Sequence, residues 1–245
     1  MLADIATIVW KESKEFIQGS SRGSSVSRLL FPIALAGILL PWRSGRGYVT
    51  GTTALIGLLW ILPMVAVSLT VDSIAGERER HTLESLLATR LSDQAVLFGK
   101  LAASVVYAWG MMLTSLVVGL ITVNLRQRPG APLLLFTPAY AAMLVLVSFL
   151  GAILVCGLAV LVSVRASTVR QAAQTFAYGS TGIIVGSVFG AQALPLSWRL
   201  MIVRILIGPY SMQAELVAGL IFVALDLAVL AAARHRFQRA RLILD

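Results

Sequence analysis

The chain has little charge, one cysteine and two histidines. Asp, Glu, Lys and Arg make up 13% of its 245 residues, against roughly 25% in an average soluble protein. Hydrophobic residues make up 58%, which is more apolar surface than one globular core of this size can hide. We therefore expect an all-α membrane protein whose excess apolar surface faces lipid.

Residues that could carry out catalysis are scarce and scattered. His81 and His235 are far apart, and Cys156 lies alone in an apolar run, so an intrachain disulfide is excluded. The sequence has no G-x-x-x-x-G-K-[ST] phosphate loop and no H-E-x-x-H or Cys/His cluster. We expect no enzyme here, and no catalytic, cofactor-binding or metal-binding residue in this chain.

The net charge of +9 could indicate a nucleic-acid partner. The basic residues, however, are spread between the apolar segments instead of forming one patch interleaved with aromatics. Membrane topology explains them better, so we expect contact with membrane lipid and no nucleic acid.

Six apolar segments are candidates to cross a bilayer. The first is short and contains Pro32 and Pro41, and the fifth carries Gly182, Gly186 and Gly190 at a spacing that favours close helix packing in lipid. We predict six transmembrane helices in one transmembrane domain spanning residues 1–245. The predicted spans are residues 26–42, 52–71, 101–125, 138–164, 172–194 and 214–233.

Three further segments lie outside these spans. Residues 1–25 predict an amphipathic interfacial helix, anchored by Trp10, followed by a Gly/Ser-rich hinge. Residues 92–100 predict a second short helix, with Ser92 and Asp93 suited to cap its start. Residues 195–213 predict a short helix in the membrane interface, broken at Gly208.

The basic residues indicate the orientation of the spans. With six spans, fourteen of the 20 lysines and arginines lie on the side that holds both termini and residues 73–100. Because positive charge gathers on the cytoplasmic side of membrane proteins, we predict a multi-pass protein with both termini and residues 73–100 in the cytoplasm.

Residues 73–87 form the densest run of charge in the chain. If this run is helical, Glu77, Arg80 and Glu84 share one face, while leucines at positions 83, 86 and 87 form a separate apolar stripe. Such a helix has two different surfaces to bury. A solvated charged loop with one helical turn is the alternative that charge runs usually adopt.

The runs AGERER at residues 75–80 and TLESLLAT at residues 82–89 resemble the signature of type-2 ABC-transporter permeases. In that family the segment follows the second membrane helix and forms a cytoplasmic coupling helix that docks on the ATPase subunit. The resemblance implies that residues 73–100 are the coupling segment. The ATPase-coupling residues would be Glu77, Arg78, Glu79, Arg80, Thr82, Leu83, Glu84, Leu86 and Leu87.

The resemblance also implies a function and partners. The chain would be the permease subunit of an ATP-driven ABC exporter in the cell membrane. ABC ATPase subunits at the cytoplasmic face would bind ATP and magnesium. A second permease half, either an identical or a similar chain, would complete the complex, and the sequence does not identify the cargo.

Two other functions stay open on the sequence. A membrane scaffold could recruit a cytoplasmic partner through the charged segment without transport. A secondary transporter is less well supported, because the two halves show no internal repeat. Asp226, inside the sixth segment, is a candidate pathway carboxylate or a structurally paired one.

Overall fold

The computed structural model describes residues 2–18, 30–51, 53–79, 92–127, 130–197 and 211–236. Within these ranges the regular structure is helical and contains no strand. In chain order the elements are α1 (Leu2–Gln18), η1 (Ile33–Leu39), α3 (Leu40–Ser44), α4 (Gly47–Thr50), α5 (Thr53–Glu79), α7 (Asp93–Leu125), α8 (Pro138–Ser163), α9 (Val169–Ala193) and α11 (Ser211–Arg236).

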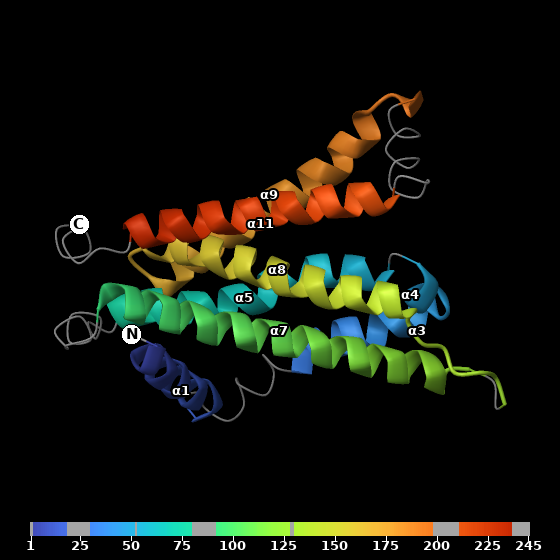
Figure 1. Cartoon of the computed structure of the whole chain (residues 1–245), viewed down its shortest axis with the longest axis horizontal. Helices are drawn as coiled ribbons and strands as arrows, with labels where there is room; N and C mark the ends of the chain where they lie inside the picture. Colours follow the sequence, from blue (N-terminus) through green and yellow to red (C-terminus); the bar gives the residue numbers. More distant parts are fainter. Residues whose placement is uncertain are drawn as a thin grey trace.

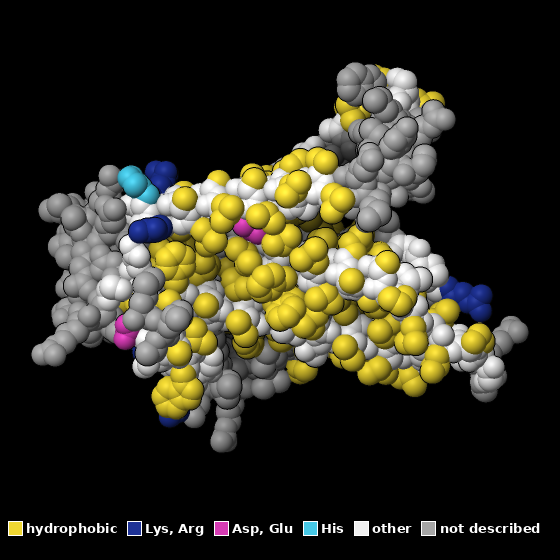
Figure 2. Space-filling model, viewed as in Figure 1, with side chains coloured by type: hydrophobic (Ala, Val, Ile, Leu, Met, Phe, Trp, Pro, Cys, Tyr) yellow, Lys and Arg dark blue, Asp and Glu magenta, His cyan; other side chains and the backbone are white. Residues whose placement is uncertain are grey.

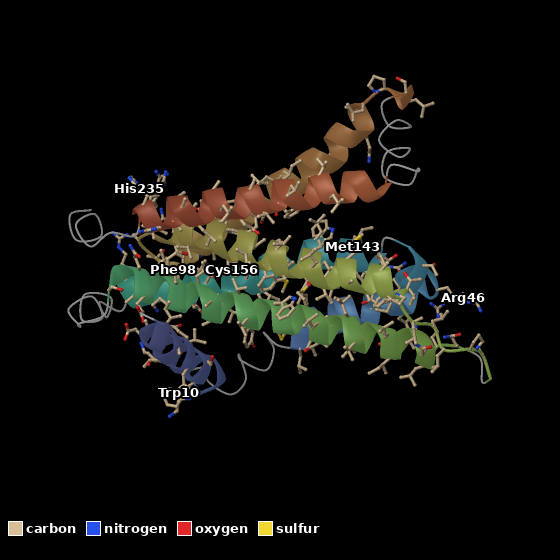
Figure 3. All side chains as sticks on the ribbon, in the orientation of Figure 1. Trp10, Arg46, Phe98, Met143, Cys156 and His235 are labelled. Carbon is tan, nitrogen blue, oxygen red and sulfur yellow. The ribbon has the colours of Figure 1, made fainter. Side chains whose placement is uncertain are left out.

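Helices α5, α7 and α8 pack on one another and form the centre of the bundle. Helix α1 and the short η1 pack on α7, α11 packs on α8, and α9 contacts α5 and α8. In Figure 1 these central helices and α11 run along the long axis, while α9 diverges from α11. Figure 3 labels Phe98 and His235 at one end, called here the motif end, and Arg46 at the opposite end.

Four helices are long and apolar enough to cross a membrane: Thr53–Glu79, Gln94–Leu125, Pro138–Ser163 and Leu216–Arg236. They coincide with four of the predicted spans. Figure 2 shows hydrophobic side chains across the middle of the visible face, with Lys and Arg at the two ends. This distribution fits a bundle whose middle lies in lipid.

The other two predicted spans are not among these four. Leu30–Ser44 is apolar but shorter, and α9 has the length, at 25 residues, but carries Arg170, Gln171 and Gln174 in its first two turns. The all-helical class is confirmed, and the number of six spans stays a prediction.

Helix α7 corrects one expectation about the charged region. Residues 93–100 do not form a separate short helix, because α7 runs without a break for 33 residues. At 1.5 Å per residue α7 is about 50 Å long, roughly 20 Å more than a bilayer core requires. Its first turns can therefore lie outside the hydrocarbon. Helix α5 likewise continues past residue 71 to Glu79.

Three helices start at side-chain N-caps. Ser92 accepts a hydrogen bond from the Ala95 amide at the start of α7, as the sequence predicts. Thr137 and Thr168 do the same for α8 and α9, accepting from the residue three positions further on. Each hydroxyl oxygen satisfies one of the amides that a helix start leaves without an intrahelical partner.

The first apolar segment is irregular. Residues 33–39 form a π-helix between Pro32 and Pro41, and π-helical turns are rare in proteins. The hydroxyl of Thr122 donates to the carbonyl oxygen of Gly37 at 2.7 Å. A Cβ atom on Gly37 would lie only 2.9 Å from Val118. Close packing on α7 therefore holds this segment.

The predicted N-terminal helix is present as α1, and its placement at a membrane surface stays a prediction. The hinge at 19–25, residues 26–29 of the first span and positions 198–210 of the predicted interfacial helix lie outside the described residues. On α9, a Cβ atom added at Gly182, Gly186 or Gly190 would meet no described atom within 4 Å. The glycine stripe therefore makes no interhelical contact with the described part of the chain.

Candidate functional site

The predicted coupling segment begins at the motif end of α5. Glu77, Arg78 and Glu79 form the last turn of that helix. Residues 80–91, which connect α5 to α7, lie outside the described residues. Of the predicted coupling residues, this region holds Arg80, Thr82, Leu83, Glu84, Leu86 and Leu87.

Glu77 takes part in a buried polar cluster that joins three helices. The ammonium group of Lys100, on α7, lies 2.7 Å from a carboxylate oxygen of Glu12 on α1 and 3.0 Å from one of Glu77 on α5. It also donates to the carbonyl oxygen of Ser73 at 2.8 Å. Lys11 of α1 lies 3.6 Å from the same Glu77 oxygen. We call Lys11, Glu12, Ser73, Glu77 and Lys100 the Lys100 cluster.

Burial makes the Lys100 cluster sensitive to the loss of a partner. The side chains of Lys100 and Glu12 are 2% and 3% exposed. An ammonium has three donors, and Glu12, Glu77 and Ser73 supply three acceptors. Taking charges out of water costs several kcal/mol per ion, and removing one partner of a buried pair destabilises proteins by about 3–5 kcal/mol. Lys100 therefore ties α1, α5 and α7 together as long as all three acceptors are present.

Helix α1 approaches α7 closely beside this cluster. A Cβ atom on Gly99 would lie 2.7 Å from the Cβ of Ile8, so only glycine allows the observed distance. Ile8 and Glu12 are four residues apart and share one face of α1. Trp10 points away from the bundle (Figure 3) and is 66% exposed, with the Lys14 ammonium 5.1 Å from its ring centroid.

Arg78 and Glu79 contact the turn between α8 and α9. The Arg78 guanidinium donates to the carbonyl oxygen of Val164, the C-cap of α8, at 3.0 Å. The Glu79 carboxylate accepts from the amide of Val169, the first residue of α9, at 3.0 Å. A cation at a helix C-terminus and an anion at an N-terminus both match the helix dipole. Three consecutive side chains of α5 thus reach α1, α7, α8 and α9.

Asp226 occupies a different place, on the face of α11 that packs on α8. It is 5% exposed, and neither carboxylate oxygen has a hydrogen-bond partner among the described residues. One turn further along α11, Val229 lies so near α8 that a Cβ atom on Gly157 would be 2.6 Å from it. The structure brings Asp226 into the bundle but not to the Lys100 cluster.

A metal site is not evident in this part of the molecule. The described ranges contain no group of three or more His, Cys, Asp or Glu side chains that could hold a metal ion. The polar groups that gather among the described residues form ion pairs and helix caps that join neighbouring helices.

Comparison with protein families decides the class of the chain. The family described as ABC-2 family transporter protein matches residues 12–238. The chain belongs to the ABC-2 transporter family. No curated protein matches the chain. Membership supports a role as the multi-pass membrane permease of an ABC transporter, and members of this family are typically not catalytic themselves.

The sequence located the charged segment of this ABC-2 chain but not its partners. Helical spacing placed Glu77 on one face with Arg80 and Glu84, but it gave no sign that the Glu77 carboxylate lies 3.0 Å from the Lys100 ammonium. Glu12 and Lys100 are 88 residues apart, and each sits in a run that reads as a membrane boundary. The available signal is Gly99 beside Lys100, because small residues in membrane helices allow another helix to approach closely.

Proposed function

We propose that this ABC-2 chain is the permease subunit of an exporter driven by a separate ABC ATPase. The ATPase subunits would bind ATP and Mg²⁺ at the cytoplasmic face and convert hydrolysis into movement of this bundle. The family match over residues 12–238 supports this role. Residues 1–245 contain no phosphate loop, and this agrees with an energy source that lies outside them.

One observation carries the proposed coupling route. Glu77, Arg78 and Glu79 connect the end of α5 to α1 and α7 on one side and to the α8–α9 turn on the other. An ATPase that docks on residues 80–91 would therefore move several helices when it moves this segment. The leucines at positions 83, 86 and 87 would seat in a groove of the ATPase, while the charged residues fix the register.

The complex would contain two permease halves and two ATPase subunits. The second half would be another copy of this chain or a similar one. The excess of lysine and arginine on the side of both termini supports a cytoplasmic placement of that side in the cell membrane. Because charge within the spans is sparse, a hydrophobic or amphipathic cargo fits best.

Reconstitution tests the proposal without knowledge of the cargo. The purified chain would be placed in vesicles with candidate ABC ATPase subunits from the source genome, beginning with any encoded beside it. We expect the chain to stimulate Mg-ATP hydrolysis by one of them. If the chain stimulates none of them and binds none of them, the exporter assignment is contradicted and a scaffold is favoured.

A further inference from the structure

Lys100 connects the N-terminal helix to the start of the coupling segment. We infer that Lys100 is a positioning residue that fixes α1 to α5 and α7, so that these helices move as one unit when the ATPase moves residues 80–91. The inference rests on the proposed function. It adds α1, which lies far from this segment in sequence, to the moving part of the permease.

The chemistry of the Lys100 cluster supports a fixed junction. Two carboxylates, from Glu12 and Glu77, face two ammonium groups, from Lys11 and Lys100, so their charges balance. The Lys100 side chain is 2% exposed, so water competes poorly for its hydrogen bonds. Exposed ion pairs exchange with solvent and constrain little, whereas a buried group with every donor used holds its partners in one arrangement.

Glu77 is held from two sides in this arrangement. Lys100 approaches it from α7, and Lys11 approaches the same carboxylate oxygen from α1. Lys11 is 45% exposed and adds little constraint, so the buried Lys100 is the main link. The last turn of α5 cannot rotate without breaking its contact with Lys100, which also holds Glu12 of α1, and movement of the following segment is transmitted to α1 through Glu77 and Lys100.

The contact of Ile8 with Gly99 supports the same junction independently of charge. It brings α1 and α7 within the distance that the Glu12 contact with Lys100 requires. Gly99→Ala would push α1 outward without removing any of the four charged side chains. Gly110→Ala, on the same helix, meets no atom within 4 Å and is the matched control.

The test compares Lys100→Met, Glu12→Gln and Gly99→Ala with Gly110→Ala in vesicles that contain the full chain and its ATPase. Three quantities are measured: retention of the ATPase, the unfolding temperature, and the rate of Mg-ATP hydrolysis stimulated by the permease. We expect Lys100→Met and Gly99→Ala to retain the ATPase but to lose at least about 5-fold of the stimulated rate, the low end of coupling between distant sites. Glu12→Gln keeps an acceptor oxygen and should lose less, and Gly110→Ala should match the wild type.

The outcomes separate this inference from the proposed function. If the wild type stimulates hydrolysis and Gly99→Ala and Lys100→Met stimulate it equally well, the positioning role is overturned while the permease role stands. If the wild type stimulates no ATPase, the proposed function itself fails. Should Lys100→Met not fold, Gly99→Ala and Glu12→Gln decide the question, because both leave Lys100 in place. A lower unfolding temperature with an unchanged stimulated rate marks a purely structural role and also overturns the inference.

Discussion

The guanidinium of Arg78 donates a hydrogen bond to the carbonyl oxygen of Val164, 86 residues further along the chain. Val164 is the C-cap of α8, and the amide of Val169, the first residue of α9, donates to the Glu79 carboxylate. The turn between α8 and α9 is thus attached to the last turn of α5. A movement at the start of the coupling segment would reach two helices that the chain connects to it only distantly.

Arg78→Met should loosen the turn between α8 and α9. Hydrogen bonds from charged groups contribute about 1.5–3 kcal/mol, and because Arg78 is partly exposed we expect a loss of about 1 kcal/mol. Hydrogen–deuterium exchange should rise at residues 164–172. Arg165→Met, an exposed arginine of the same turn, is the control and should leave exchange unchanged. Equal exchange in Arg78→Met and Arg165→Met would show that the Arg78 hydrogen bond does not hold the turn between α8 and α9.

Gly157→Ala should destabilise the contact between α8 and α11. The added Cβ would lie 2.6 Å from a methyl carbon of Val229, so one helix must shift. Overpacking of this kind costs about 1–3 kcal/mol and should lower the unfolding temperature in detergent. Gly219→Ala on α11 meets no atom within 4 Å, and a similar loss in that control would refute the packing explanation.

Asp226→Asn should stabilise the protein without changing its coupling. A carboxylate inside a membrane helix costs about 2.5–3.5 kcal/mol at the helix centre, and Asp226 has no hydrogen-bond partner among the described residues to offset that cost. We expect a higher unfolding temperature and an unchanged rate of permease-stimulated ATP hydrolysis. A lost rate at unchanged stability would instead place Asp226 in the transport pathway.

Thr122→Val should weaken the attachment of the π-helix to α7. The Thr122 hydroxyl is within hydrogen-bond distance of the carbonyl oxygens of Gly37 and Val118, at 2.7 and 2.8 Å. Valine has nearly the same shape but no donor, so we expect a loss of about 1 kcal/mol by thermal unfolding. Thr122→Ser keeps the hydroxyl and should lose less, and identical losses would show that the hydrogen bond contributes nothing.

The lengths of the apolar runs predicted the long helices well. Charged residues led to wrong predictions of where those helices end. A lysine at position 100 inside an apolar run reads as the membrane edge, so the sequence favoured a helix break there. The structure continues α7 through Lys100 because Glu12 and Glu77 neutralise it. The π-helix could not be predicted either, since Pro32 and Pro41 signal an irregular segment but not its hydrogen-bond pattern.

The candidate site was predictable only in part for a similar reason. The charged run around Glu77 stands out by composition and by its resemblance to a family. Its partners do not, because Glu12, Lys100 and Val164 come from distant parts of the chain and the folded bundle brings them together. Local spacing shows only which residues share a face of one helix, so it could group Glu77 with Arg80 and Glu84 but could not show that Lys11 and Lys100 lie beside Glu77.

Cysteine cross-linking to the ATPase tests the central claim most directly. In a Cys156→Ala background, single cysteines would be placed at positions 79, 83, 86 and 87, and at exposed Arg46 at the opposite end as the control. We predict ATPase cross-links from several positions between 79 and 87 and none from position 46. Cross-links from position 46 alone, or labelling of positions 79–87 by a membrane-impermeant thiol reagent added outside intact cells, would contradict the account.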